Sequence, residues 1–276
     1  MPELPEVQTI SSQLDPLVRG QLITAVQVLD PRCAEQDLAE LVGWQVSGAQ
    51  RLGKQVGLEL SRGADRRWLA AHLRMTGRML WQPGSGPWQR PHLRALFELE
   101  RGALLFVDVR RFGTLRFSSD RATLLPAGLD PMTRAFNARA LGKLLGESRQ
   151  ELKVWLLRQD RLVGLGNIYA CEILHLARLS PWRQAGSLST PEVALLRRST
   201  REVLERAVEN CGTTFSDFQD ANGNMGGYQR YLSVYGREGD VCKRCGEAVE
   251  RVVQGGRSTF FCPVCQPGEH PVRQER

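Results

Sequence analysis

Apolar residues recur with the period of an α-helix near the start of the chain. Pro5 suits the first turn of such a helix, and Gly20 suits the position just after its end. Between them, every third or fourth residue is apolar, which predicts one amphipathic helix. The residues on its apolar face are Val7, Ile10, Leu14 and Leu17.

From about residue 21 to residue 117 the pattern changes to short, strand-like segments that Gly, Pro or charged turns separate. Together with the first helix, this region predicts an N-terminal β-sandwich domain over residues 1–117. The clearest strand candidates are residues 55–60, 68–73, 93–99 and 103–107.

Residues 118–134 contain Pro126, Gly128 and Pro131 and are predicted to be a linker. The apolar period then becomes helical, so we predict a helical region over residues 135–230 and an α+β fold overall. Residues 219–227 hold three glycines and little to pack, which predicts a mobile loop. The helix candidates are residues 141–145, 152–157, 168–176 and 193–208.

The net charge adds only weak evidence about the partner of the protein. The chain has 37 Lys and Arg against 30 Asp and Glu, a formal net charge of +7, and almost all of its cations are arginines. Arginine suits bidentate contact with phosphate, so the charge favours a nucleic-acid partner, although simple solubility explains it equally well. The sequence shows no apolar run long enough for a membrane span and no secretion leader.

Four of the seven cysteines form two Cys-x2-Cys pairs, Cys242 with Cys245 and Cys262 with Cys265, with sixteen residues between the pairs. This spacing predicts one closed tetrahedral Zn²⁺ site of structural type. The segments between the pairs can form a hairpin, giving a zinc ribbon over residues 231–266, with a polar tail over residues 267–276. Arg257, at the hairpin turn, is a candidate probe of phosphate or the minor groove.

The other cysteines are Cys33, Cys171 and Cys211, and they lie apart in apolar or helical contexts. We expect them to be buried free thiols. An odd number of cysteines without a leader favours a reducing cytosol over a disulfide framework.

Three further segments carry chemistry, each with a simpler alternative. Residues 163–169, Val-Gly-Leu-Gly-Asn-Ile-Tyr, can form an anion site at a helix start that Asn167 caps, or only a packing corner. Residues 108–114 place Phe112 beside two arginines after a strand, either as an intercalating wedge or as a core residue. At the N-terminus, removal of Met1 would expose the Pro2 amine as a nucleophile beside Glu3, but Pro2 and Pro5 can also merely start the helix.

Taken together, these segments resemble the formamidopyrimidine-DNA glycosylase family. The match covers nearly the whole chain in order, from the Pro-Glu-Leu-Pro-Glu-Val start to the four cysteines. It also includes residues 72–77, His-Leu-Arg-Met-Thr-Gly, and residues 234–237, Val-Tyr-Gly-Arg. The resemblance implies a β-sandwich, a helix–two-turns–helix region and a zinc ribbon. It also implies a monomeric bacterial, cytoplasmic enzyme that excises oxidised purines from duplex DNA and cleaves the abasic strand by β,δ-elimination.

The resemblance implies a role for individual residues. Pro2 is the expected nucleophile, Glu3 the general acid and Lys54 a catalytic residue near the lesion, although the local sequence alone indicates a solvated turn residue at Lys54. Three residues are expected to fill the gap left by the flipped base: Met75, Arg110 and Phe112. The other expected DNA contacts are His72, His92, Arg111, Lys153, Asn167 and Arg257.

Two alternatives stay open. An endonuclease VIII-like enzyme would prefer oxidised pyrimidines, but Leu4 differs from the glycine expected there. A non-catalytic zinc-ribbon DNA-binding protein would not need Pro2, Glu3 and Lys54. The chain also departs from the family pattern at three positions: Gln8, Arg158 and Tyr228. The departure at Tyr228 leaves the contacts of the lesion loop open.

Overall fold

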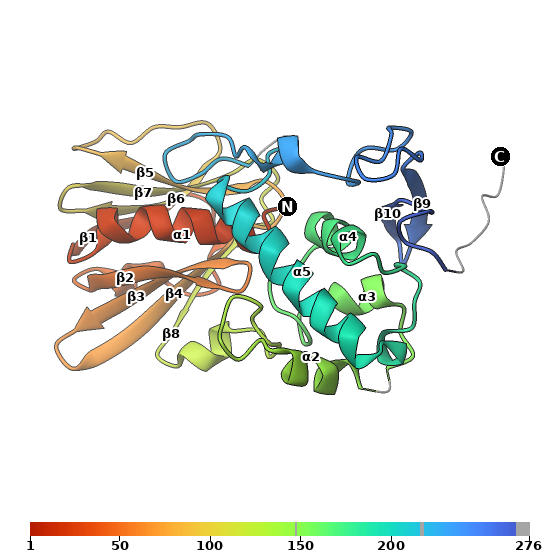
Figure 1. Ribbon diagram of the computed structural model, residues 1–276. Helices are drawn as coiled ribbons and strands as arrows, with labels where there is room; N and C mark the ends of the chain where they lie inside the picture. The colour runs from red at the N-terminus through yellow and green to blue at the C-terminus, as the bar shows by residue number, and fades with distance from the viewer. Residues whose placement is uncertain (147, 216–217, 269–276) are drawn as a thin grey trace. The chain divides into compact units, whose positions relative to one another are not determined.

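The computed structural model describes residues 1–268 except residues 147 and 216–217. The chain forms two compact units. The first combines residues 1–126 with residues 207–229, and the second combines residues 127–206 with the chain from residue 230 onward. Figure 1 shows the helices and strands of both units.

The first unit begins with helix α1 (Leu4–Val18), which confirms the predicted amphipathic helix. Glu3 is its N-cap, and Pro5 lies in the first turn, where a missing N–H costs no hydrogen bond. Val7, Ile10 and Leu14 of the predicted face are fully buried. The start of the chain is therefore held by the core of the unit.

Two four-stranded antiparallel sheets follow, in the orders β1-β6-β7-β5 and β2-β3-β4-β8. In Figure 1 helix α1 lies alongside both sheets. The strands are β1 (Ile23–Val28), β2 (Gln45–Leu52), β3 (Gln55–Arg62), β4 (Asp65–His72), β5 (Gly77–Pro83), β6 (Leu93–Leu99), β7 (Gly102–Asp108) and β8 (Thr114–Ser118).

The main core lies between the two sheets and joins apolar residues of α1 to residues from most of the strands. Strand β7 shows how the pattern works. Leu104 and Phe106 point into this core, while Leu105 and Val107 join a second apolar cluster on the opposite face. Because successive side chains of a strand alternate between faces, β7 is buried on both sides, and residues 103–107 are all apolar. This arrangement confirms the predicted sandwich.

The second unit is helical and ends in a two-stranded hairpin. Helix α5 crosses the division, since its last three residues count with the first unit. No helix in the described ranges is both long and apolar enough to span a membrane. The elements are α2 (Ala138–Leu145), α3 (Leu152–Leu156), α4 (Asn167–Leu176), α5 (Thr190–Glu209), β9 (Glu250–Gln254) and β10 (Arg257–Phe261).

The glycine-rich loop at residues 219–227, predicted to be mobile from its composition, makes hydrogen bonds that the composition does not predict. The buried carboxylate of Asp220 accepts hydrogen bonds from the backbone N–H groups of Asn222 and Asn224 at 2.9 and 2.8 Å. The Gln13 side chain donates to Asp220 at 3.0 Å and accepts from the Ala221 N–H. Helix α1 therefore anchors this loop, through a pairing of residues about two hundred positions apart that composition cannot reveal.

Candidate functional site

Pro2 and Glu3, at the N-terminus of the first unit, are both buried, while Met1 is exposed. The Glu6 carboxylate accepts the Glu3 N–H at 2.8 Å and the Thr213 N–H at 2.7 Å. A side chain at Gly212 would meet the Glu6 carboxylate. The start of the chain is thus fixed against the segment after α5, and Pro2 lies next to a buried carboxyl group.

Sequence reasoning assigned no role to Glu6, although a signal was present. The third residue of a helix often bonds back to the N-cap when it is Glu or Gln. Glu3 and Glu6 have this spacing and form this capping box.

Lys54 lies in the two-residue turn between β2 and β3. Gly53 takes a positive φ of 65° there, as such tight hairpin turns require, and Leu52 pairs with Gln55 in register. Lys54 is only 9% exposed, so it is not the solvated turn residue that the sequence alone would suggest. The backbone of the turn therefore fixes the position from which the Lys54 side chain extends.

His72, at the end of β4, pairs in register with Gln55 of β3. Burial, together with the charges of Arg74, Lys54 and Arg116, lowers the pKa of His72 to about 4. The imidazole is therefore neutral near pH 7. Its Nδ1 accepts the Arg74 N–H at 3.1 Å, which leaves the proton on Nε2 as a donor for an anion.

The buried carboxylate of Asp108 joins two loops at the end of the sheet. Its Oδ1 accepts the Thr76 hydroxyl and the Arg110 N–H, the latter at 3.2 Å, and its Oδ2 accepts the Gly113 N–H at 2.7 Å. The backbone oxygen of Asp108 accepts from Arg94 Nε at 2.7 Å. Hydrogen bonds to the Asp108 carboxylate therefore hold the loops at residues 73–77 and 109–113 in place relative to each other.

These loops display three of the residues expected to enter DNA. Met75 is 44% exposed and Phe112 is 52% exposed, so Phe112 is not a core residue. The Arg110 guanidinium lies 4.8 Å from the centre of the Phe112 ring. An exposed aromatic ring and an exposed methionine on rigid backbone are suited to wedging into a base stack.

The neighbouring residues are held differently. Arg111 has a φ of 62° and forms an ion pair with the buried Asp30 carboxylate, with 2.5 Å between Nε and Oδ2. His92 is exposed with a φ of 64°, and its backbone oxygen accepts the Asp108 N–H at 3.0 Å. Its Nδ1 lies 3.5 Å from Arg94 Nη2. His92 thus belongs to the same hydrogen-bonded support as the wedge loop.

In the second unit, Gly166 is the N-cap of α4 and Asn167 is its first residue, so the predicted capping role of Asn167 is wrong. Asn167 instead donates from Nδ2 to the Ser258 oxygen at 2.8 Å, next to Arg257. Its Oδ1 is buried and has no hydrogen-bond partner among the described residues. Gln159 shapes the approach to the helix by accepting the Gly164 N–H at 2.9 Å.

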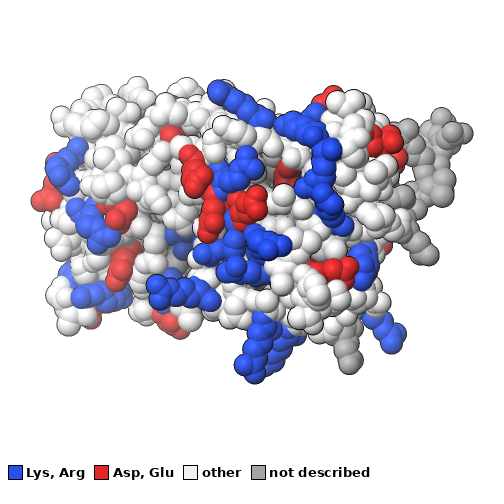
Figure 2. Space-filling view, in the orientation of Figure 1, with Lys and Arg blue, Asp and Glu red and all other residues white. Residues whose placement is uncertain are grey.

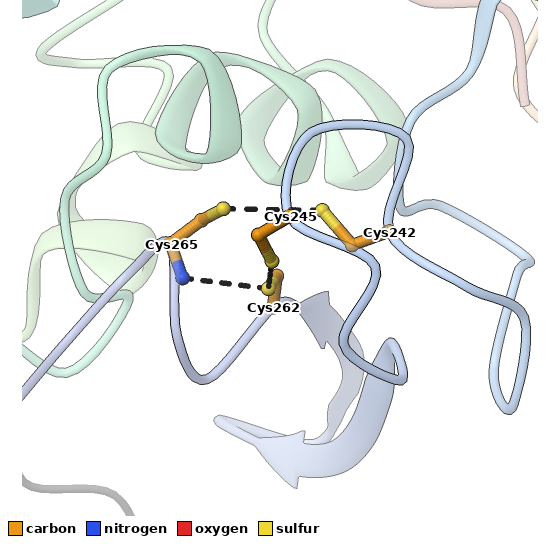
Figure 3. Close-up of side chains that lie close together, drawn as sticks. All are labelled: Cys242, Cys245, Cys262 and Cys265. Carbon is orange, nitrogen blue, oxygen red and sulfur yellow. Dashed lines mark hydrogen bonds between the residues drawn. The ribbon is translucent and has the colours of Figure 1, made fainter.

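The four paired cysteines bring their sulfur atoms within 4.8 Å of one another. Figure 3 shows the sulfurs pointing toward a common centre, with Cys242 at 3.9 Å from Cys265 and Cys245 at 3.4 Å from Cys262. A Zn–S bond of about 2.3 Å in a tetrahedron implies sulfurs about 3.8 Å apart. The donor set and spacing therefore fit one zinc ion with no open coordination position.

The pKa values of two of these thiols are shifted in opposite directions. Burial raises the pKa of Cys242, but hydrogen bonds from the backbone of Arg244 and Cys245 outweigh it and lower the value to about 7. Burial and the neighbouring thiols together raise the pKa of Cys262 to about 12. Four thiolates this close need a metal cation to be stable together.

His175 supports the metal ligands from α4. Its Nε2 lies 3.4 Å from the Cys242 sulfur. Burial, together with the charges of Arg244, Arg237 and Arg178, lowers the pKa of His175 to about 4. A neutral imidazole can donate an N–H to a thiolate and orient it. Nothing in the spacing of the sequence pointed to this contact.

Arg257 begins β10 after the turn Gly255-Gly256, in which both glycines have positive φ, as a type I′ turn requires. Arg257 is exposed at this tip. Lys153 of α3, expected as a direct DNA contact, is fully buried and donates to the Thr259 hydroxyl at 2.8 Å and the Ser258 oxygen at 3.2 Å. Lys153 therefore supports the hairpin through hydrogen bonds to β10, which corrects the expectation of a direct contact with DNA.

Of the three cysteines outside the cluster, Cys33 and Cys171 are buried as expected, whereas Cys211 is only partly buried. Burial raises the pKa of Cys33 to about 11, so this thiol is unreactive at neutral pH.

Charge alone does not mark a binding surface. Figure 2 shows Lys and Arg side chains spread over the visible face with acidic side chains beside several of them. Ion pairs such as Arg19 with Asp15 and Arg183 with Glu192 explain part of this pattern. The geometry of the residues above is therefore more informative than the net charge.

Comparison with known protein families assigns most of the chain in three parts. The formamidopyrimidine-DNA glycosylase N-terminal domain matches residues 1–115, and the H2TH domain of the same family matches residues 127–219. The zinc finger found in FPG and IleRS matches residues 239–268.

Individual relatives match over their full length. A protein of Thermus thermophilus named formamidopyrimidine-DNA glycosylase is 44% identical, with 98% of this chain and 100% of the relative covered. The crystal structure of the MutM (Fpg) protein from that organism has a TM-score of 0.87 at 42% identity, with 98% of this chain and 100% of the other covered. A complex of a Lactococcus lactis FPG mutant with DNA containing Fapy-dG has a TM-score of 0.87 at 32% identity, covering 97% and 100% of the two chains.

Proposed function

Because the chain belongs to the formamidopyrimidine-DNA glycosylase family, we propose that it excises oxidised purines such as 8-oxoguanine and formamidopyrimidines from duplex DNA. It then cleaves the DNA at the abasic site, so it is a bifunctional glycosylase and lyase of base excision repair. The observation that carries this proposal is the exposed Phe112 beside Arg110, fixed by a buried carboxylate in the same unit as the buried Pro2 and Glu3. Such exposure has no value for folding and suits an enzyme that opens a base stack.

Pro2 is the proposed nucleophile once Met1 has been removed, since only a free amine has an available lone pair. Its nitrogen attacks C1′ of the flipped nucleotide, the bond from C1′ to the base breaks, and the base leaves with the proton that the amine nitrogen gives up. Glu3 gives a proton to O4′ as the sugar ring opens, and the nitrogen lone pair completes an iminium.

The iminium withdraws electrons and acidifies the C2′ hydrogens. Loss of one of them expels the 3′-phosphate by β-elimination, and a second, δ-elimination expels the 5′-phosphate. Lys54, in the tight turn beside His72, is proposed to hold the lesion or its phosphate. His72 is proposed to donate from Nε2 to the DNA backbone.

Opening of the base pair is assigned to the wedge loops. Met75 and Phe112 fill the vacated stack, and Arg110 contacts the orphaned base. Arg257 and Asn167 are proposed phosphate contacts of the second unit. Zinc supplies folding free energy to the ribbon and takes no part in bond breaking, because four cysteines close its coordination.

We also propose that the catalytic part corresponds to residues 1–117, the helical DNA-binding part to residues 135–230 and the ribbon to residues 231–266. A monomer acting on DNA in the bacterial cytoplasm is the cellular form that fits this assignment, since a thiolate zinc site needs a reducing compartment.

Product analysis tests the proposal. A duplex with one 8-oxoguanine opposite cytosine should lose the free base and acquire a one-nucleotide gap with phosphate at both ends. A matched duplex with thymine glycol should react more slowly. Preference for thymine glycol would favour an endonuclease VIII-like enzyme, and binding without any strand cleavage would leave only a DNA-binding protein.

A further inference from the structure

Asp30 follows β1 and has two structural duties. It is the N-cap of a short 3₁₀ helix (Pro31–Cys33), where its side chain accepts the Arg32 N–H. The same carboxylate, with a side chain only 4% exposed, forms ion pairs with Arg111 at 2.5 Å and with Arg32 at 3.3 Å. A carboxylate this buried depends strongly on its partners, because an unpaired buried charge is costly.

The position of Asp30 is tied to the wedge loop through Arg94. The Arg94 backbone oxygen accepts the N–H groups of Leu29 and Asp30 at 2.8 and 3.1 Å. The Arg94 guanidinium in turn donates to the backbone oxygen of Asp108 at 2.7 Å. Asp30 is therefore part of the same hydrogen-bonded support as Asp108, and of the two adjacent arginines it pairs with Arg111.

Arg110 and Arg111 carry the same guanidinium group, so their chemistry alone does not decide which one meets the DNA. The structure treats them differently. Arg110 stacks on Phe112, whereas Arg111 takes a left-handed backbone conformation and places its charge on Asp30. A left-handed φ is rare for a residue other than glycine and persists only where surrounding contacts hold it.

We propose that Asp30 is a specificity-determining residue that sequesters Arg111, so that Arg110 alone is presented to the orphaned base. This inference rests on the proposed glycosylase function and deepens it. A single donor-only guanidinium matches the O2 and N3 acceptors of cytosine and meets the amino group of adenine unfavourably. If Arg111 is released from Asp30, it adds an unspecific phosphate contact and competes with Arg110 for the space beside the orphaned base.

Asp30→Ser tests this role, because serine keeps the N-cap and removes the partner of Arg111. The ratio of single-turnover excision rates opposite cytosine and adenine should fall by about tenfold, the lower end of the discrimination expected from one unpaired amino group. Affinity for undamaged DNA should rise at the same time, with a salt dependence steeper by about one phosphate contact. Simple loss of structure would lower the affinity, so the opposite signs separate the two explanations.

Two controls isolate the contact with Arg111. Asp37→Ser changes another Asp that caps a 3₁₀ helix (Leu38–Leu41) and accepts the Ala39 N–H at 3.0 Å, and it should leave both quantities unchanged. Arg32→Gln removes the other partner of Asp30 and should also leave the ratio unchanged. In an Arg111→Gln background, Asp30→Ser should have no further effect on the ratio, as a double-mutant cycle requires for a direct coupling.

Trapping at a pre-formed abasic site and thermal unfolding are measured on each variant. If Asp30→Ser unfolds, Asp30→Asn, which keeps the cap and the shape and removes the charge, is measured in its place. A folded variant with the wild-type ratio and the wild-type affinity for undamaged DNA would overturn the role of Asp30. Absence of excision by the wild-type protein would instead overturn the proposed function.

Discussion

The two units hold their candidate DNA contacts by different means. In the first unit a large apolar core between two sheets supports the wedge, and the buried carboxylates of Asp108 and Asp30 fix its loops. In the ribbon of the second unit, the apolar cluster is small and consists largely of thiols, three of which are the metal ligands Cys242, Cys262 and Cys265. The first arrangement needs only the chain itself, whereas the second needs a metal. The comparison indicates that chemistry and DNA affinity can be lost separately.

The largest effect is expected in the first unit. Glu3→Gln should lower base excision by about 10²–10⁴-fold, the usual contribution of a general acid or base. The amide can still accept the hydrogen bond of an N-cap, so folding and DNA binding should persist. Single-turnover excision and lesion-DNA affinity are measured in parallel. Wild-type excision by this variant would remove Glu3 from the mechanism.

Loss of zinc should affect the second unit alone. Cys262→Ser should unfold the hairpin and weaken lesion-DNA binding by roughly tenfold to a hundredfold, the value of a lost hydrogen bond to a charged group. Cys171→Ala is the control. Cys171 is a buried cysteine of the same apolar cluster but is not one of the four metal ligands, so this variant should retain zinc and DNA binding. Normal DNA binding by Cys262→Ser would contradict the dependence of the ribbon on metal.

Arg110→Ala tests the wedge itself. Its removal should narrow the preference for excision opposite cytosine over adenine by about tenfold to a hundredfold, because the adenine amino group no longer faces donors only. Reaction at a pre-formed abasic site should change less. Arg121→Ala is the control, since Arg121 is an exposed arginine of the same unit to which no DNA contact is assigned. A preference that stays unchanged in Arg110→Ala would refute the reading of the orphaned base by this arginine.

The smallest effect concerns the support of the hairpin. Lys153→Met removes a buried charge, leaves the Thr259 hydroxyl without its lysine donor and leaves the Ser258 oxygen with the Asn167 amide as donor, so the ribbon should lose about 1–3 kcal/mol of stability. Thermal unfolding and zinc release measure this loss. Lys143→Met, at an exposed position of α2, should be neutral. Equal behaviour of the two variants would show that the buried lysine does not stabilise the hairpin.

Local patterns could be predicted from the sequence wherever one period or one spacing carries the information. The face of α1, the strand β6 and the cysteine cluster are such cases. Contacts between residues far apart in the chain could not be predicted. The ion pair of Arg111 with Asp30 and the anchoring of Asp220 by Gln13 both depend on how the chain folds back on itself.

The same limit explains the corrections at the site. Lys153 has the sequence context of an exposed cation on a short helix, yet the hairpin packs over it and supplies oxygen partners. Asn167 is of a residue type that often caps helices, but Gly166 is the N-cap of α4, and the Asn167 amide bonds to the Ser258 oxygen instead. In both cases a tertiary contact decides what a side chain does.

The central claim, that the amine of Pro2 forms the covalent bond to DNA, is tested by trapping with borohydride. Active protein is reacted with 8-oxoguanine DNA, reduced and digested, and the peptide that carries the sugar is identified by mass. The account predicts a cross-link at Pro2 in protein that lacks Met1, and no cross-link in a preparation that retains it. Full trapping by protein that retains Met1, or a cross-link at Lys54 in place of Pro2, would contradict it.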